Sequence, residues 1–300
     1  MSAAVTSFLR WSAQASLTRY WPDKMHAALV QLTSTDDPVA NLPVTRSMLA
    51  DAAMQGADLI ATPEVTNCVS TSRSHQQRVL QTEAEDITLA ALREDAAKLG
   101  VWVLIGSLAL RTDDPDGRFA NRSFLIAPDG QIAARYDKIH MFDVDIDATE
   151  TYRESDGYRP GGNAVCADTP FGRIGLTICY DMRFPRLYRA LAQNGAQILT
   201  APSAFSAVTG AAHWEALLRA RAIETGSYVL APAQCGTHRA TRGKTRQTHG
   251  HSLAVGPWGE VLADAGDVPG VTLVEIDLAQ VDAARRKVPS LRHDRAFEGP

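Results

Sequence analysis

Residues 174–185, IGLTICYDMRFP, contain in one stretch a strand, a short loop and the start of a helix. Residues 174–178 are almost entirely apolar or β-branched, as in a strand that is covered on both faces. Pro185 suits the first turn of a helix, which is predicted to run to Asn194 and to end at Gly195. Cys179 therefore stands at the carboxyl end of a strand, the edge at which open α/β sheets bind ligands. A nearby helix N-terminus would favour its thiolate form.

The rest of the chain alternates strand–helix units with hairpins. Apolar runs and turn signals predict strands at 27–32, 58–62, 101–108, 197–201 and 228–233, and hairpins at 123–136, 164–179 and 251–263. Helices are predicted after Pro38, with Val44, Met48, Leu49 and Ala52 on one apolar face, and at 87–99, 185–194 and 213–225. This alternation predicts one α/β domain over residues 25–300, with a C-terminal arm after Asp277 that is polar enough to wrap a neighbouring subunit.

The composition and charge are those of an ordinary globular protein, with 45% apolar and 21% charged residues. A formal net charge of −4 and the lack of long Lys or Arg runs give no electrostatic footprint for nucleic acid or for an anionic membrane. No apolar stretch approaches the ~20 residues of a membrane span. The expected partner is a small molecule, with no nucleic acid and no membrane.

The four cysteines (Cys68, Cys166, Cys179 and Cys235) lie far apart and form no C-x-x-C pair. The spacing indicates neither a zinc site nor a disulfide framework, and reduced thiols in the cytoplasm fit it best.

Residues 1–24 differ from the rest, with Arg10 and Arg19, several hydroxyl side chains and no acid before Asp23. They resemble an organelle transit peptide. The alternative is a disordered extension, or a start codon assigned too far upstream, because Met25 directly precedes the first predicted strand. The predicted fold excludes them.

Glu64 and Lys138 also follow predicted strands. Glu64 comes after Pro63, which cannot continue the hydrogen-bond ladder, and Lys138 follows residues 131–136. Singly, each has a plain structural interpretation: Cys179 as a small core residue, Glu64 as a solvated carboxylate and Lys138 as a surface lysine. Together they would suit a thiol nucleophile whose base is a carboxylate with a raised pKa.

Three ordered motifs strongly resemble those of the nitrilase superfamily of carbon–nitrogen hydrolases. They are ATPE (61–64), YDKIHMFDVD (136–145) and ICYDMRFP (178–185), and the resemblance runs from about Met25 to the C-terminal region. It implies a four-layer α-β-β-α sandwich. It also implies a homodimer, for which we expect residues 213–225 and the C-terminal arm to supply the interface.

The same resemblance implies amide hydrolysis through a cysteinyl thioester, with neither a metal nor an organic cofactor. Glu64 would take the thiol proton, Cys179 would attack the amide carbon, and the oxyanion would rest against Lys138 and the backbone N–H of Tyr180. Glu64 would then protonate the departing ammonia and activate the water that releases a carboxylic acid. Glu154 matches a second family glutamate. Lys138 would favour the thiolate, while the two glutamates keep the lysine charged.

Further motifs resemble the branch that contains the deaminated glutathione amidases and the ω-amidases. They are SAF (203–205), TG (209–210), HWE (213–215), RARAIE (219–224), AQCG (233–236) and GHS (250–252), of which the last three favour the first group. The implied substrate is a terminal amide of a small 2-oxo acid, deaminated glutathione, with α-ketoglutaramate or another aliphatic amide as the alternative. Arg183 would clamp a substrate carboxylate unless it pairs with Asp181, and Phe205 and Thr209 would line the acyl pocket.

Other interpretations stay open. A Cys–His hydrolase would use His140 or His213 as its base. A binding or assembly protein would keep the fold without turnover, and transfer to an amine would use the same thioester. His249 and His251 share a face of a predicted strand, but no third ligand lies at useful spacing, so no metal site is predicted. Cys235 is expected to be a small apolar residue rather than a second thiol near the pocket.

Overall fold

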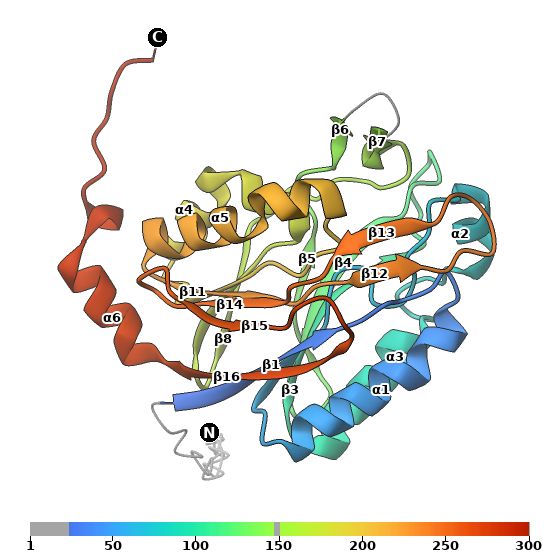
Figure 1. Cartoon of the computed structure of the whole chain (residues 1–300), viewed down its shortest axis with the longest axis horizontal. Helices are drawn as coiled ribbons and strands as arrows, with labels where there is room; N and C mark the ends of the chain where they lie inside the picture. The colour runs from blue at the N-terminus through green and yellow to red at the C-terminus, as the bar shows by residue number, and fades with distance from the viewer. Residues whose placement is uncertain (1–23, 147–150, 300) are drawn as a thin grey trace, which may run out of the picture.

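The computed structural model describes residues 24–146 and 151–299. Two six-stranded sheets stack face to face, and helices cover the outer face of each sheet (Figure 1). The predicted extension, residues 1–24, lies outside the described residues apart from Lys24, which begins the first strand. Within the described ranges, no helix has the length and apolar character that crossing a bilayer requires.

The first sheet has the strand order β16-β1-β2-β3-β4-β5. The strands β1, β2 and β3 are parallel, β4 and β5 form the predicted hairpin, and β16 pairs antiparallel with all of β1. No strand was predicted at β16, although Val271, Thr272 and Val274 have the β-branched side chains that favour strands. The bounds are β1 (Lys24–Gln31), β2 (Leu59–Ala61), β3 (Trp102–Leu110), β4 (Ala120–Ile126), β5 (Ile132–Asp137) and β16 (Gly270–Asp277).

The second sheet has the order β15-β14-β11-β10-β9-β8. Both predicted hairpins of this sheet are confirmed, and β9, β10 and β11 are parallel. The bounds are β8 (Val165–Thr169), β9 (Gly172–Leu176), β10 (Ile198–Thr200), β11 (Tyr228–Ala231), β14 (Leu253–Val255) and β15 (Val261–Asp264).

Alternation along β1 shows how the layers are held. Ala28 and Val30 pack into a core with α1 (Pro38–Met54) and α3 (Ile87–Leu99), whereas Ala27 and Leu29 belong to the core shared with the second sheet. The outer face of that sheet is covered by α4 (Pro185–Gln193) and α5 (Ala207–Thr225). The predicted four-layer α-β-β-α sandwich is therefore the observed architecture (Figure 1).

Two predicted helices differ in detail. The buried face of α1 is Asn41, Thr45, Leu49 and Ala52, while Val44 is exposed. The reason is that Asn41 hydrogen-bonds the backbone of Thr35 and of Asn67 and so fixes the rotation of the helix. The helix α5 begins at Ala207 rather than at residue 213, which places Thr209 in its first turn.

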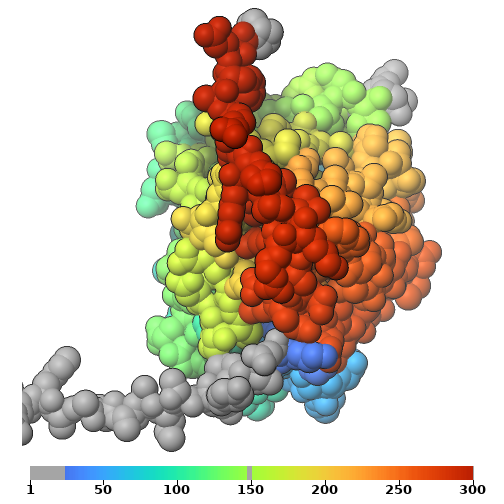
Figure 2. Space-filling model, turned by 90° about the vertical axis from the view of Figure 1, so that its left-hand side faces the viewer, coloured from blue at the N-terminus to red at the C-terminus, as the bar shows by residue number. Residues whose placement is uncertain are grey.

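The arm after Asp277 is partly built into its own chain. Its first ten residues form α6 (Leu278–Lys287), in which Val281 and Ala284 are buried. The Arg285 guanidinium donates to backbone oxygens of Ala196 and Thr225. The first part of the arm is therefore packed on its own chain, and the expectation that the arm also reaches a neighbouring subunit stays a prediction. Only the last residues, after the short turn η3 (Ser290–Arg292), project from the body (Figure 2).

Shorter elements stand around one end of the sandwich. These are α2 (Arg73–Val79) and the hairpins β6 (Asp143–Asp145) with β7 (Thr151–Arg153) and β12 (Cys235–His238) with β13 (Arg246–His249). Gly106 in β3 lets the two sheets approach closely there, because a Cβ on it would lie 2.0 Å from the Thr62 oxygen and 2.5 Å from Pro202. The loops that follow β2, β5, β9 and β10 therefore meet at this end.

Candidate active site

Cys179 sits at a sharp turn after β9. Its φ of 48° lies in the left-handed region, which a non-glycine residue adopts only when its surroundings hold it there. Its N–H donates to the Pro202 oxygen at 2.9 Å, and the residue begins the 3-10 turn η2 (Cys179–Arg183). The side chain is 7% exposed and lines a cavity of about 680 Å³. The turn presents the thiol to the cavity and places the N–H of Tyr180 at the start of the turn, where it has no partner within the turn itself.

Asp181 ties the cysteine turn to the segment that carries Lys138. Its fully buried carboxylate accepts from Ile178 N–H at 2.9 Å and from Tyr136 Oη at 2.6 Å. It also accepts from the backbone N–H of His140 at 3.0 Å and contacts His140 Nδ1 at 2.7 Å. Because four groups from two loops share this one carboxylate, the two loops are held at a fixed separation.

A buried lysine lies between two glutamates. Lys138 Nζ is 2.8 Å from Glu64 Oε1 and 2.8 Å from Glu154 Oε2, and the lysine side chain is 2% exposed. Asn121 Nδ2 donates to Glu64 Oε1 at 2.9 Å and to Glu154 Oε1 at 3.3 Å. Backbone groups donate as well: Ala204 N–H to Glu64 Oε2 at 2.8 Å, and Phe142 N–H to Glu154 Oε2 at 2.6 Å, the oxygen that also contacts Lys138. Such a network is strongly held, since each buried charge has both an opposite charge and hydrogen bonds.

The pKa values in this cluster correct two expectations. Burial has the largest single effect and raises the pKa of Glu64, but the charge and hydrogen bond of Lys138, the charge of Arg246 and the Ala204 N–H together outweigh it, so the net pKa is lowered. Burial, together with Glu64, raises the pKa of Cys179 well above its ordinary value despite the opposing effect of Lys138. The resting site is therefore a neutral thiol beside an ionised glutamate, and not the expected thiolate. Lys138 stays charged, because its two glutamates more than offset its burial and raise its pKa.

The cavity brings together most of the predicted site residues. Cys179, Glu64, Lys138, Glu154, Tyr180, Phe205 and Thr209 all line it. Arg183 does not: its guanidinium lies over the rings of Tyr180 and Phe205 at 5.9 and 5.5 Å and contacts His213 Nδ1 at 3.3 Å. The alternative pairing with Asp181 is not formed, because Asp181 already has its four partners. The clamp on a substrate carboxylate stays a prediction.

The two histidines of the rival mechanism point elsewhere. His140 contacts Asp181 and stacks on Phe184, with ring centroids 3.5 Å apart, and His213 is exposed at the surface. Neither lines the cavity. The geometry therefore gives Cys179 a carboxylate neighbour and no histidine neighbour.

The remaining sequence candidates lie away from the thiol. His249 ends β13, and His251 lies beyond it at φ 54°, so the two do not share a strand, although their rings stack at 4.7 Å. Over residues 24–146 and 151–299, no three His, Cys, Asp or Glu side chains are placed to hold a metal. Cys235 is fully buried with its sulfur 3.3 Å from Thr33 Oγ1, and all four cysteines are free.

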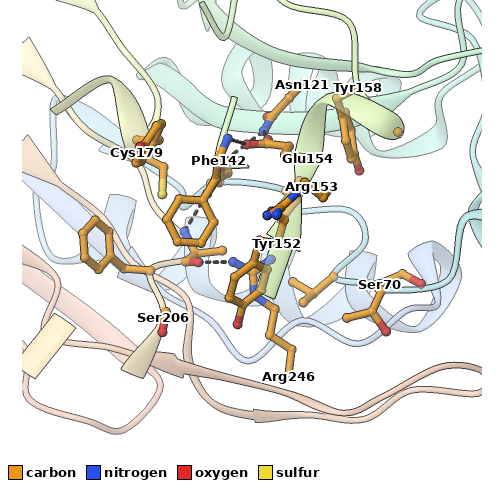
Figure 3. Close-up of a pocket in the computed structure, with 18 of the residues that line it drawn as sticks. Ser70, Asn121, Phe142, Tyr152, Arg153, Glu154, Tyr158, Cys179, Ser206 and Arg246 are labelled. Carbon is orange, nitrogen blue, oxygen red and sulfur yellow. Dashed lines mark hydrogen bonds between the residues drawn. The ribbon is translucent and has the colours of Figure 1, made fainter. Parts of the chain in front are cut away.

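Sequence reasoning missed Asn121, Arg246 and the walls supplied by the two hairpins. Figure 3 shows Phe142, Tyr152 and Arg246 around the cavity that Cys179 enters. Asn121 stands in β4 without a motif of its own, and Arg246 comes from a polar loop region that offered no periodic signal. Hydrogen bonds to residues far away in the sequence, from Asn121 to Glu64 and from Arg246 to Ala204, place them at the site.

The chain is similar to known proteins along most of its length. A family model described as carbon–nitrogen hydrolase matches residues 26–286. A curated relative, the deaminated glutathione amidase of Yersinia enterocolitica, is 40% identical over 271 residues, which cover 90% of this chain and 93% of the relative.

Two solved structures share the fold. Saccharomyces cerevisiae Nit3, a member of branch 10 of the nitrilase superfamily, superposes with a TM-score of 0.79 at 28% identity, over 93% of this chain and 99% of that chain. A mutant of the amidase from Nesterenkonia sp. AN1 gives 0.71 at 26% identity, over 88% of this chain and 94% of that chain. In the latter, the acetamide moiety of fluoroacetamide is covalently added to the active-site cysteine.

Proposed function

The chain belongs to the carbon–nitrogen hydrolase family, and on that premise we propose that it is an amidase that cleaves deaminated glutathione through a thioester on Cys179. The observation that carries the proposal is the cavity in which a buried thiol faces a carboxylate held by a lysine. The curated relative named for this activity, similar along nine-tenths of the chain, supports the substrate.

Acylation begins from a thiol. Because the pKa of Cys179 is raised and that of Glu64 is lowered, a free thiolate is unfavourable, and proton transfer to Glu64 must accompany attack on the amide carbon. As negative charge develops on the amide oxygen, Lys138 and the N–H of Tyr180 stabilise it. Lys138 then shares its charge with the oxyanion, which makes Glu64 more basic at the moment at which it accepts the proton. Glu154 holds the lysine in place throughout.

The leaving group of this substrate is an amine rather than ammonia. In deaminated glutathione, the amide joins a 2-oxoglutaryl group to the nitrogen of cysteinylglycine, so the bond is internal and not terminal. Glu64 gives its proton to that nitrogen, and the dipeptide departs. Water, activated by Glu64, then attacks the thioester, and 2-oxoglutarate leaves while the thiol regains its proton. The α-ketoglutaramate of the ω-amidase alternative has the same acyl half and releases ammonia.

Three amides separate the candidate substrates. We expect kcat/KM for deaminated glutathione to exceed that for α-ketoglutaramate, and both to exceed that for a simple aliphatic amide such as butyramide. The measurement is release of 2-oxoglutarate or butyrate by purified protein. Preference for α-ketoglutaramate would replace the proposed substrate with that of the ω-amidases. No turnover of any of the three would favour a binding protein, and acyl transfer would show as an amide product when a second amine is added.

The pH profile distinguishes the glutamate base from a histidine base. Glu64 must be ionised, and its pKa lies below the ordinary value of about 4.3, so activity is retained down to about pH 5 and is lost only below it. Lys138 must be charged, and its raised pKa keeps it so past about pH 10. We therefore expect kcat/KM to be constant between about pH 5 and 9. Circular dichroism over the same range checks that the protein stays folded. A Cys–His pair would instead give an acidic limb near about pH 6.5.

We also propose a homodimer in the cytoplasm. Support comes from apolar side chains exposed on and beside α5 (Val208 and Ile223) and on the projecting C-terminal residues (Phe297, 89% exposed). Apolar surface of this kind gains stability when a second subunit covers it. Sedimentation velocity at micromolar concentration is expected to give a dimer, and a monomeric boundary would contradict the proposal.

A further inference from the structure

Arg246 is a cation on the cavity wall that forms no direct ion pair, although its charge is close enough to help lower the pKa of Glu64. It begins β13, and its guanidinium lies 5.8 Å from the centre of the Tyr152 ring. Figure 3 shows the two side chains beside each other at the cavity. One nitrogen, Nη2, donates to the Ala204 oxygen. Its Nε is buried without a hydrogen-bond partner, and no acid of the described ranges forms an ion pair with this arginine. A buried guanidinium donor left unpaired is costly, which indicates a ligand group at this position.

The other cations of the cavity are already engaged or exposed. Arg153 pairs with Asp145, Arg73 donates to the backbone oxygens of Asp116 and Asp156, and Lys244 is exposed at the rim. Lys138 is held between its two glutamates. Among the cations of the described cavity wall, Arg246 is the one with a buried nitrogen, Nε, that has no hydrogen-bond partner.

The cavity as a whole favours an anion. Five cationic and three acidic side chains line it, although the whole chain has a formal charge of −4. A positive hollow on an acidic protein attracts negatively charged ligands and raises their local concentration. Because Lys138 neutralises the catalytic glutamates only in part, the attraction must come from the outer wall, where Arg246 is the least exposed cation.

The first turn of α5 lies beside Arg246. His249 N–H donates to the Phe205 oxygen at 3.0 Å, and Ser206 bridges Thr248, so β13 runs along the start of the helix. Thr209 Oγ1, in that first turn, is buried without a partner and lines the same cavity. The N-terminal end of a helix also carries partial positive charge. An arginine fork, a free hydroxyl and a helix N-terminus together match a carboxylate next to a carbonyl oxygen.

We propose that Arg246 is the specificity-determining residue that binds the 2-oxo carboxylate of the acyl half of the substrate, with Thr209 as a second donor. This inference rests on the proposed function, which supplies the acyl half. It explains why Arg183, which lies outside the cavity, is not needed as a clamp. A purely structural role is the alternative, because Arg246 holds Ala204, whose N–H in turn holds Glu64.

A pair of substrates that differ only in the carboxylate separates the two roles. 2-Oxoglutaryl-cysteinylglycine carries it, and 4-oxopentanoyl-cysteinylglycine replaces it by a methyl group while keeping the ketone, the amide and the leaving group. Arg246→Gln is expected to lower kcat/KM for the acid about 10–100-fold, because a charge-assisted contact is lost. The loss for the neutral analogue is expected to be several times smaller. Arg246→Lys should fall between, since it keeps the charge but not the fork.

Binding without turnover makes the test independent of catalysis. Calorimetry on the Cys179→Ala protein measures the affinity for 2-oxoglutarate and for levulinate. Adding Arg246→Gln is expected to lower the affinity for 2-oxoglutarate at least about tenfold and to leave the affinity for levulinate unchanged. Arg219→Gln, on the exposed side of α5, is the matched surface control and should change neither affinity.

The outcomes separate the inference from the function. Equal losses for the acid and the neutral substrate, or an Arg246→Gln variant that binds 2-oxoglutarate as the parent does, would overturn the role of Arg246 while amidase activity stands. The opposite outcome has two parts: the wild-type protein does not cleave the deaminated substrate, but Arg246→Gln still weakens 2-oxoglutarate binding in the Cys179→Ala protein. That result would overturn the proposed function and leave the carboxylate site intact.

Discussion

Cys179→Ala is expected to lower kcat/KM for deaminated glutathione by about 10⁵-fold or more, to the level of the background reaction. The thioester needs a sulfur, and residues that act as one unit lose nearly all chemistry when the nucleophile is removed. The substitution removes one buried atom and keeps the backbone turn at φ 48°, so stability should change by only about 1–2 kcal/mol. Product release and thermal unfolding measure the two effects.

Cys235→Ala is the matched control for that variant. Cys235 is also buried and free, but it packs against Thr33 and does not line the cavity. It should lose a similar small amount of stability and retain activity. A Cys179→Ala protein with a tenth or more of the wild-type rate would rule out Cys179 as the nucleophile. A Cys235→Ala protein as inactive as the first would show that the loss of activity is not specific to Cys179.

Lys138→Met is expected to reduce kcat/KM about 10²–10³-fold and to destabilise the fold by about 3–5 kcal/mol. The first loss comes from a missing oxyanion donor. The second arises because Glu64 and Glu154, both in contact with Nζ, are left near each other without their shared cation. At neutral pH, the pair is expected to respond by binding a proton. Denaturant unfolding at pH 7 and steady-state rates measure both quantities.

A second substitution separates the two effects of the lysine. Adding Glu154→Gln to Lys138→Met removes one of the two unpaired charges, so much of the lost stability should return while the activity stays low. If stability and activity recover together, the lysine acts only by holding the fold. If Lys138→Met alone unfolds no more easily than the wild type, the buried ion pairs are not what stabilises this site.

The helices and strands that build the layers could mostly be predicted, because residues next to one another in the sequence determine where each begins and ends. The helix at residues 87–99 is observed with these bounds, since Asp86 caps its start and Gly100, at φ 69°, ends it. The motif around Cys179 predicted a strand, a turn and a helix for the same kind of reason. By contrast, no strand was predicted for residues 270–277, although their β-branched side chains favour one, and β16 pairs with all eight residues of β1.

The site was predictable only in part. Glu64, Lys138 and Cys179 each follow a strand, and strand ends converge at one edge. Their pKa directions were not predictable, because they depend on how closely Lys138 approaches each glutamate and how fully the thiol is buried. Asn121 and Arg246 stand on strands that pair with their neighbours in the chain, β4 with β3 and β5, and β13 with β12. Their side chains nevertheless contact the distant residues Glu64 and Ala204, and no spacing in the sequence records those contacts.

The most direct test of a thioester on Cys179 is rapid acid quenching of the wild-type protein during turnover of deaminated glutathione, followed by peptide mass spectrometry. We expect a 2-oxoglutaryl group on the peptide that contains Cys179. Hydroxylamine should remove this group, and the Cys179→Ala protein should lack it. An acyl group found on a different side chain of an enzyme that is turning over, with Cys179 unmodified, would contradict the proposed thioester.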